Sequence, residues 1–167
     1  CTNRYVGDDF FEEAFKFVLP GYNVRPLEMS GAVGIEQLKK LPNFISTRIT
    51  NAKLFIKLFS NHPYISIQSE IGQSSWFGFS MILKKESPVT RKEFVAALEE
   101  NDIECRPIVT GNFLKNKDVL EYFDYTLVCS NENAEYLDIN GLFVGNHQVN
   151  LSKELNLLHS VTNKLMK

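Results

Sequence analysis

The chain has 167 residues, 44% of them hydrophobic, and a formal net charge of −2 at neutral pH. This length and apolar share suit one folded domain, or one domain with a piece of another, and exclude a disordered chain. The slightly acidic balance excludes a nucleic-acid coat or a binder of anionic membranes, because both need a basic surface. An anionic ligand therefore has to be held by a few placed cations.

The three cysteines, Cys1, Cys105 and Cys129, have no close spacing. They form neither a disulfide framework nor a zinc pattern, so we expect no metal site and a reducing, cytoplasmic location. No apolar run reaches the roughly 18 residues of a membrane span, and no charged-then-apolar leader opens the sequence. Because the sequence does not begin with methionine, we expect a fragment of a longer protein.

The first part of the chain is organised around a glycine turn. Aromatic residues are dense over 10–18, where alternation predicts a short extended piece, and Phe15 is expected in a core, a subunit interface or a ligand wall. The turn itself, GYNVRP at 21–26, presents Asn23 and Arg25 from a constrained backbone. Such an arginine suits a carboxylate or phosphate, although the spacing alone slightly favours an ordinary salt bridge.

Two helices are predicted next, over 26–41 and 43–59, with Pro42 starting the second. Glycines 31 and 34 inside the first helix suggest the close approach of another backbone. In the second helix Ile45, Ile49, Ala52, Ile56 and Phe59 follow the helical period and predict the buried face. The opposite face, with Arg48, Asn51 and Lys57, is expected to be solvated.

Beyond residue 60 the pattern alternates between strands and helices. Strands are predicted over 64–68, 76–84, 103–109 and 141–145, and helices over 90–100, 117–123, 131–139 and 152–166. In the second strand Phe77, Phe79, Met81 and Leu83 share one face. Thr90 and Glu93 form a capping box for the helix that follows. This order predicts an α/β fold, a small sheet flanked by helices.

No local catalytic signature is present, and the three histidines are scattered. His159 is expected to be a packed or surface residue, and His62 to cap a helix end. His147 follows an apolar strand, and a ligand role and a structural hydrogen bond are equally supported there. Arg106 lies among apolar residues before a proline, either paired with an acid such as Glu104 or facing a ligand.

Several stretches resemble a known family. GYNVRPLEMSGAVGIEQL at 21–38 is similar to a conserved stretch of the DegT/DnrJ/EryC1/StrS family of pyridoxal-phosphate sugar aminotransferases. FKFVLP at 15–20, SWFGFS at 75–80, ECRPIVTGNFLK at 104–115 and FVGNHQ at 143–148 resemble its dehydratase branch. That branch removes the C3 hydroxyl of a GDP-linked 4-keto sugar, with glutamate as the amino donor, in deoxysugar and O-antigen synthesis.

The resemblance implies a fold-type I transferase that is a homodimer with shared active sites. In such enzymes Asn23 would reach the cofactor phosphate of the neighbouring subunit, and Arg25 would hold the amino-donor or substrate anion. Phe15 would wall the partner's site. Glu104 and Arg106 would meet the nucleotide-sugar, and His147 would support that pocket.

The resemblance also implies what this chain lacks. The aspartate under the cofactor's pyridine nitrogen is expected upstream of the chain. So is the residue at the cofactor's aldehyde carbon, a lysine in the aminotransferases and a histidine in the dehydratases. No catalytic residue is therefore assigned within the chain. Residues 1–41 are expected to be the tail of the large cofactor domain, and 42–167 the small carboxyl-terminal domain, linked by the 43–59 helix.

Two alternatives stay open. One is a nucleotide-sugar aminotransferase of the perosamine synthase type, because the residue that separates the two reactions lies outside this sequence. The other is a non-catalytic fragment for dimerisation or ligand binding.

Overall fold

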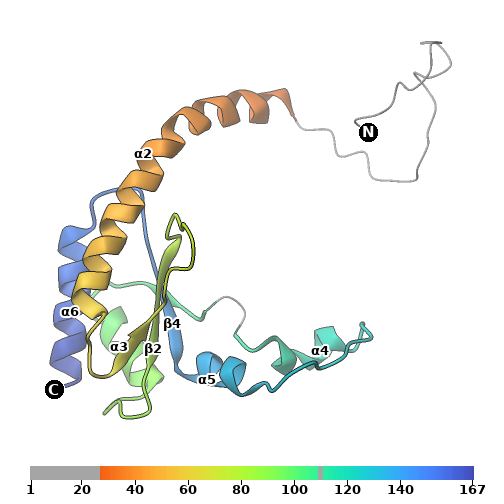
Figure 1. Ribbon diagram of the computed structural model, residues 1–167, viewed down its shortest axis with the longest axis vertical. Coiled ribbons are helices and arrows are strands. Elements are labelled where there is room, and N and C mark those ends of the chain that lie inside the picture. The colour runs from red at the N-terminus through yellow and green to blue at the C-terminus, as the bar shows by residue number, and fades with distance from the viewer. Residues whose placement is uncertain (1–26, 109–110) are drawn as a thin grey trace. The chain divides into compact units, whose positions relative to one another are not determined.

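The computed structural model of the protein describes residues 27–108 and 111–167. From Lys40 onward the chain forms one compact unit. Its sheet is antiparallel and four-stranded, in the order β1-β2-β4-β3. The strands are β1 Ile65–Ile67, β2 Gly78–Leu83, β3 Cys105–Arg106 and β4 Gly141–Gly145. The helices are α2 Glu28–Phe59, α3 Arg91–Glu99, α4 Lys117–Leu120, α5 Glu132–Asn140 and α6 Ser152–Leu165 (Figure 1).

The predicted α/β class, a small sheet flanked by helices, is confirmed. Strand β4 has the predicted bounds, and the predicted capping box of Thr90 and Glu93 begins α3. Within the described ranges, no helix is long and apolar enough to cross a bilayer.

One face of the sheet carries the core. Alternate residues of β2 point to this face, and Phe79, Met81 and Leu83 are buried there, as the period of two requires. Side chains of α2, α3 and α6 cover them, among them Phe55, Phe94 and Leu158. Figure 1 shows α6 beside the carboxyl-terminal half of α2, where the His159 ring meets the Phe59 ring edge-on at 5.3 Å.

Helix α2 corrects the prediction of two helices, because it runs through Pro42 without ending. Proline removes one backbone hydrogen bond and normally costs about 3 kcal/mol in a helix interior. Strong helix formers precede Pro42, namely Leu38, Lys39, Lys40 and Leu41. After it, the packing of Phe55 and Phe59 in the core stabilises the helical conformation.

Apolar side chains just before α2 and in its first turns are exposed. Leu27, Met29, Val33, Ile35 and Leu38 are all exposed. A Cβ added at Gly31 or Gly34 would meet nothing within 4 Å. The close approach of another backbone that these glycines suggest stays a prediction.

Three strands are shorter than predicted, and β1 loses one residue at each end. β3 ends at Arg106 because Pro107 has no N–H group to donate to the ladder. β2 begins at Gly78 because Trp76 has a φ of 51°, outside the β region. The change of direction at Trp76 turns Phe77 away from the core. The prediction that Phe77 shares one face of the strand with Phe79 is therefore wrong, and its side chain is 73% exposed.

His62 lies just after α2 and is buried. Its Nδ1 accepts a hydrogen bond from the Tyr64 N–H at 3.2 Å, so it organises the turn into β1. Burial lowers the pKa of His62, and the nearby His159 and Lys84 lower it further, while a bond to Asn163 opposes them. Protonating Nδ1 would also break the bond from Tyr64.

We expect His62 to make stability depend on pH. Its folded pKa is lower than its unfolded one, so the neutral ring contributes stability above an ordinary histidine pKa of about 6.5. That contribution is lost as the pH falls below this value. Urea unfolding from about pH 7.5 to about pH 5.5 should show a steeper loss for the native chain than for His62→Gln. Equal slopes would contradict the assignment, and His147→Gln, at an exposed histidine, is the control.

Candidate functional site

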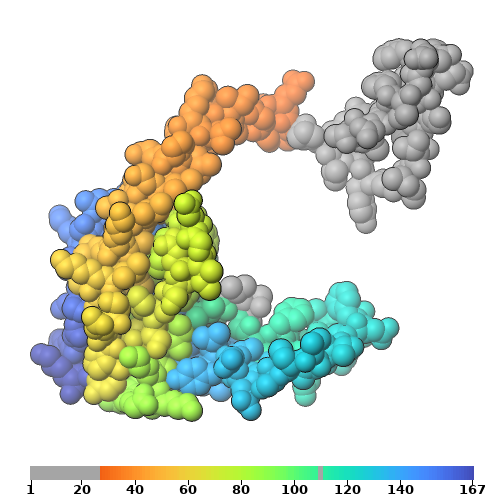
Figure 2. Space-filling model, viewed as in Figure 1, coloured from red at the N-terminus to blue at the C-terminus, as the bar shows by residue number. Residues whose placement is uncertain are grey.

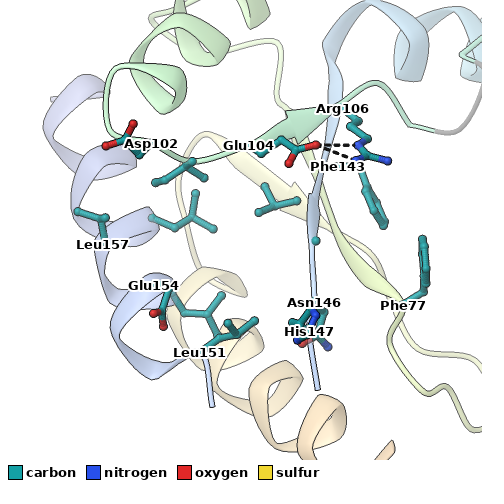
Figure 3. Close-up of a pocket in the computed structure, with 15 residues that line it drawn as sticks. Phe77, Asp102, Glu104, Arg106, Phe143, Asn146, His147, Leu151, Glu154 and Leu157 are labelled. Atoms are coloured by element: carbon teal, nitrogen blue, oxygen red, sulfur yellow. Dashed lines mark hydrogen bonds and ion pairs between the residues drawn. The ribbon is translucent and has the colours of Figure 1, made fainter. Parts of the chain in front are cut away.

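A cavity of about 470 Å³ opens where β3, the end of β4 and α6 meet (Figure 3). Its wall combines carboxylates, an arginine, a histidine, two aromatic rings and leucines of α6. Its lining includes Phe77, Glu104, Arg106, Phe143, His147 and Glu154. Three of the six predicted site residues, Glu104, Arg106 and His147, therefore meet in this cavity.

Glu104 and Arg106 form an ion pair at its rim. Arg106 donates from Nη2 and Nε to one oxygen of Glu104, at 2.7 and 3.1 Å. Their side chains are 77% and 74% exposed, and exposed pairs of this kind contribute only about 0.2–1 kcal/mol. The predicted pairing of Arg106 with Glu104 is confirmed, and Arg106 also lines the cavity, while its contact with a ligand stays a prediction. A ligand anion could therefore replace Glu104 as the partner of the Arg106 guanidinium with little loss of stability.

Phe143 stands beside Arg106 on the face of the sheet opposite to the core. The two residues are direct partners between β3 and β4, so their side chains project to the same side. The Phe143 ring lies over Gly78, where an added Cβ would overlap it. It stacks on Phe77, with ring centroids 5.7 Å apart and planes 25° apart.

Arg48 of α2 adds a second cation beside these rings. Its guanidinium carbon lies 5.8 Å from the centroid of the Phe77 ring, within the range of a cation–π interaction. Its Nε is buried and has no hydrogen-bond partner among the described residues. The prediction that this face of the helix is solvated is wrong at Arg48, which is half-buried.

The cavity lining is acidic on balance. Asp102, Glu104 and Glu154 supply three carboxylates against the single guanidinium of Arg106. Figure 3 shows Glu154 on α6, across the cavity from Phe77 and Phe143. A ligand that presents N–H donors and a flat ring fits such a wall better than a bare diphosphate does.

His147 belongs to the loop between β4 and α6. Its backbone oxygen accepts a hydrogen bond from Asn51 Nδ2 at 3.2 Å. No hydrogen bond of its imidazole occurs within the described part of the chain, and the side chain is exposed on the cavity wall. The backbone thus has the structural role, and the ring remains available to a ligand.

Asn51 and Asn146 anchor this loop, and the sequence prediction missed both. Asn51 was expected on the solvated face of its helix but is 3% exposed, because the β4–α6 loop packs over it. Asn146 is 5% exposed and hydrogen-bonds to Asn51. A signal was present, since asparagine is a poor residue for a helix interior unless its amide has a partner.

The other predicted site residues, Phe15, Asn23 and Arg25, lie outside the described residues. Among residues 27–108 and 111–167, no group of three or more His, Cys, Asp or Glu could hold a metal ion. Burial raises the pKa of the Cys105 thiol, and Glu99 and Glu104 raise it further, so this cysteine stays a neutral thiol.

The DegT/DnrJ/EryC1/StrS aminotransferase family matches residues 2–135. The chain therefore belongs to this family. One curated relative is GDP-4-keto-6-deoxy-D-mannose 3-dehydratase of Escherichia coli O55:H7. It is 67% identical over 162 residues, which are 95% of this chain and 42% of that protein.

Two solved structures are similar over nearly the whole chain. One is GDP-4-keto-6-deoxymannose-3-dehydratase with a trapped PLP-glutamate geminal diamine, with a TM-score of 0.89 at 64% identity. It is matched over 96% of this chain and 41% of that one. The other is a mutant of the same enzyme (ColD) with bound GDP-perosamine, with a TM-score of 0.88 at 66% identity, matched over 93% and 40%. The chain thus spans about two fifths of the length of these relatives.

Proposed function

We propose that this chain is the carboxyl-terminal portion of a pyridoxal-phosphate-dependent GDP-4-keto-6-deoxy-D-mannose 3-dehydratase. The whole protein would remove the C3 hydroxyl of its GDP-linked sugar in the cytoplasm, with glutamate as amino donor. The observation that carries the proposal is the meeting of Glu104, Arg106 and His147 in one cavity. These residues lie in segments that resemble the dehydratase branch, and the chain is 67% identical to one such enzyme.

In this proposal the cavity serves the nucleotide. Guanine presents adjacent N–H donors on one edge, which suit a carboxylate such as Glu104 or Glu154. The base would contact the apolar rings of Phe77 and Phe143. Phosphate or sugar oxygens would accept hydrogen bonds from Arg106 and His147. Because the wall carries more carboxylates than cations, it suits the guanine base better than the diphosphate. Binding the phosphates therefore requires further cations.

The cofactor would be held chiefly by residues outside this cavity. Asn23 and Arg25 are the proposed contacts, and both lie outside the described residues. The cavity wall itself offers one guanidinium and three carboxylates, which suit the nucleotide rather than a cofactor phosphate. When bound, pyridoxal phosphate supplies an electron sink for the loss of the hydroxyl. In the longer protein, residues 1–41 would belong to the large domain and 42–167 to the small domain.

Exposed apolar side chains support a larger assembly, proposed as a homodimer with shared active sites. Besides the first turns of α2, the α4–α5 region presents Tyr122, Phe123, Tyr125, Leu127 and Val128, all exposed. Figure 2 shows this region (cyan) extending away from the rest of the unit. Large exposed apolar groups gathered in one segment often mark an interface.

An aminotransferase of the perosamine synthase type remains the second candidate, because the family as a whole is one of aminotransferases. The residue at the cofactor's aldehyde carbon decides between them. Histidine in the complete coding sequence supports the dehydratase, and lysine would exclude it.

Binding of GDP to the chain tests the nucleotide assignment. We expect calorimetry to detect GDP binding, and Arg106→Ala to weaken it at least about tenfold, because a lost charge-assisted hydrogen bond costs about 1.5–3 kcal/mol. Lys153→Ala removes a cation from an exposed position on α6, next to Glu154, and is the matched control. No binding of GDP, or equal losses in the two variants, would contradict the assignment.

A further inference from the structure

Two buried amides, Asn51 and Asn146, connect three segments that are far apart in the sequence. Asn146 Nδ2 donates to the backbone oxygens of Trp76, at 2.8 Å, and Arg48, at 3.1 Å. Its Oδ1 accepts from Asn51 Nδ2 at 3.1 Å. The pair therefore joins α2, the approach to β2 and the loop after β4. We name it the amide clasp.

Asn51 completes the clasp on the loop side. Its Nδ2 lies within hydrogen-bond distance of the oxygens of His147 and Val149, at 3.2 and 2.8 Å, and its Oδ1 accepts from the Leu151 N–H at 3.2 Å. Every side-chain nitrogen and oxygen atom of the two amides thus takes part in at least one hydrogen bond. Buried polar networks that are fully satisfied rigidify the backbone they connect.

The clasp holds a backbone conformation that is unfavourable by itself. Trp76 is 3% exposed, and its φ of 51° lies in the left-handed region, which bulky residues rarely adopt. The bond from Asn146 to the Trp76 oxygen holds this conformation in place. Strain of this kind persists only where the surroundings over-determine it, and it is concentrated at functional sites.

Two residues that the clasp joins, Trp76 and Asn146, are each directly followed in the sequence by a residue of the cavity wall. Trp76 precedes Phe77, which its backbone turns outward to stack on Phe143. Asn146 precedes His147, whose backbone oxygen is bound by Asn51. Figure 3 shows His147 next to Asn146, with Phe77 on a separate segment of the same wall.

We propose that Asn51 and Asn146 are positioning residues that hold Phe77 and His147 in the geometry that binds the nucleotide; the choice of ligand rests on the proposed function. The amides do not touch the ligand. They act through the backbones of the two wall residues. An apolar side chain of the same size at position 146 would leave the buried oxygen of Trp76 without the donor that Asn146 supplies, so packing alone cannot replace the clasp.

Asn146→Ala is the direct test, and Asn112→Ala is its matched control. Asn112 is also buried, and its amide donates to Glu135 at 2.9 Å, outside the cavity lining. Each variant is studied in its folded state at low temperature. We expect Asn146→Ala to weaken GDP binding at least about tenfold and to shift the NMR resonance of the His147 ring. Acrylamide quenching of Trp76, the single tryptophan, should rise several-fold. Asn112→Ala should change none of these.

The readouts separate this proposal from the proposed function. If the native chain does not bind GDP, the nucleotide assignment fails, and the clasp is then judged by the His147 resonance and Trp76 quenching alone. If Asn146→Ala does not fold, Asn51→Ser, which keeps a small hydroxyl, takes its place with the same expectations. The proposal is overturned if the folded clasp variant keeps the native His147 resonance and Trp76 quenching, or matches Asn112→Ala in every readout.

Discussion

Replacing Phe79 with alanine is expected to lower the free energy of unfolding by about 3–5 kcal/mol. Phe79 has no exposed surface, and its ring stacks on Phe55 with centroids 4.4 Å apart. The truncation removes core contacts near the start of β2, where helices and sheet meet. The surrounding rings cannot collapse fully into the space, so the cost of the cavity adds to the lost burial. Urea unfolding followed by far-ultraviolet circular dichroism measures the change.

Phe77→Ala is the matched control for this prediction, because it removes the same ring two positions earlier. Since Phe77 is largely exposed, we expect a loss below about 1 kcal/mol, from its stack on Phe143 and its contact with Arg48. Similar losses in the two variants would mean that Phe77 shares the core face with Phe79, as simple alternation along the strand predicts.

Much of the fold follows from local patterns that the sequence displays openly. β4 is a short apolar run between glycines, and α3 begins at a capping box whose two residues bond to each other's backbone. Such signals need no distant partner, so they are reliable without a structure. The buried faces of β2 and α6 follow in the same way from their periods of two and 3.6.

The errors arise where contacts distant in sequence override the local pattern. Proline predicts a helix boundary at residue 42, but the helix continues because its later residues pack in the core. Alternation places Phe77 in the core, but the positive φ of Trp76, whose oxygen Asn146 binds, turns it outward. Asn51 reads as a surface residue because its partners lie about a hundred positions away.

The candidate site shows the same difference between what local patterns predict and what contacts distant in sequence determine. Family resemblance singled out Glu104, Arg106 and His147, and the structure brings them to one cavity. Nothing in their spacing predicts this, since Arg106 and His147 are about forty residues apart and meet only through the pairing of β3 with β4. The supporting residues, Arg48, Phe77 and Asn146, could not be found from the sequence. Their roles depend on which backbone atoms and rings the fold places beside them.

Gly78→Ala is expected to lower the free energy of unfolding by about 1–3 kcal/mol, as overpacking does. The new Cβ would overlap the tip of the Phe143 ring, so the ring has to leave its place above Gly78 and its stack on Phe77 is lost. Because Phe143 is part of the cavity wall, we expect the affinity for GDP to fall as well.

Gly145→Ala provides the control for stability, since Gly145 is the direct cross-strand partner of Gly78. A Cβ there meets nothing within 4 Å, and the substitution should be neutral or stabilise by up to about 1 kcal/mol. Urea unfolding of the two variants compares the same chemical change on two facing residues. If Gly78→Ala is as well tolerated as Gly145→Ala, the Phe143 ring is free to move, and the stacked pair does not shape the cavity.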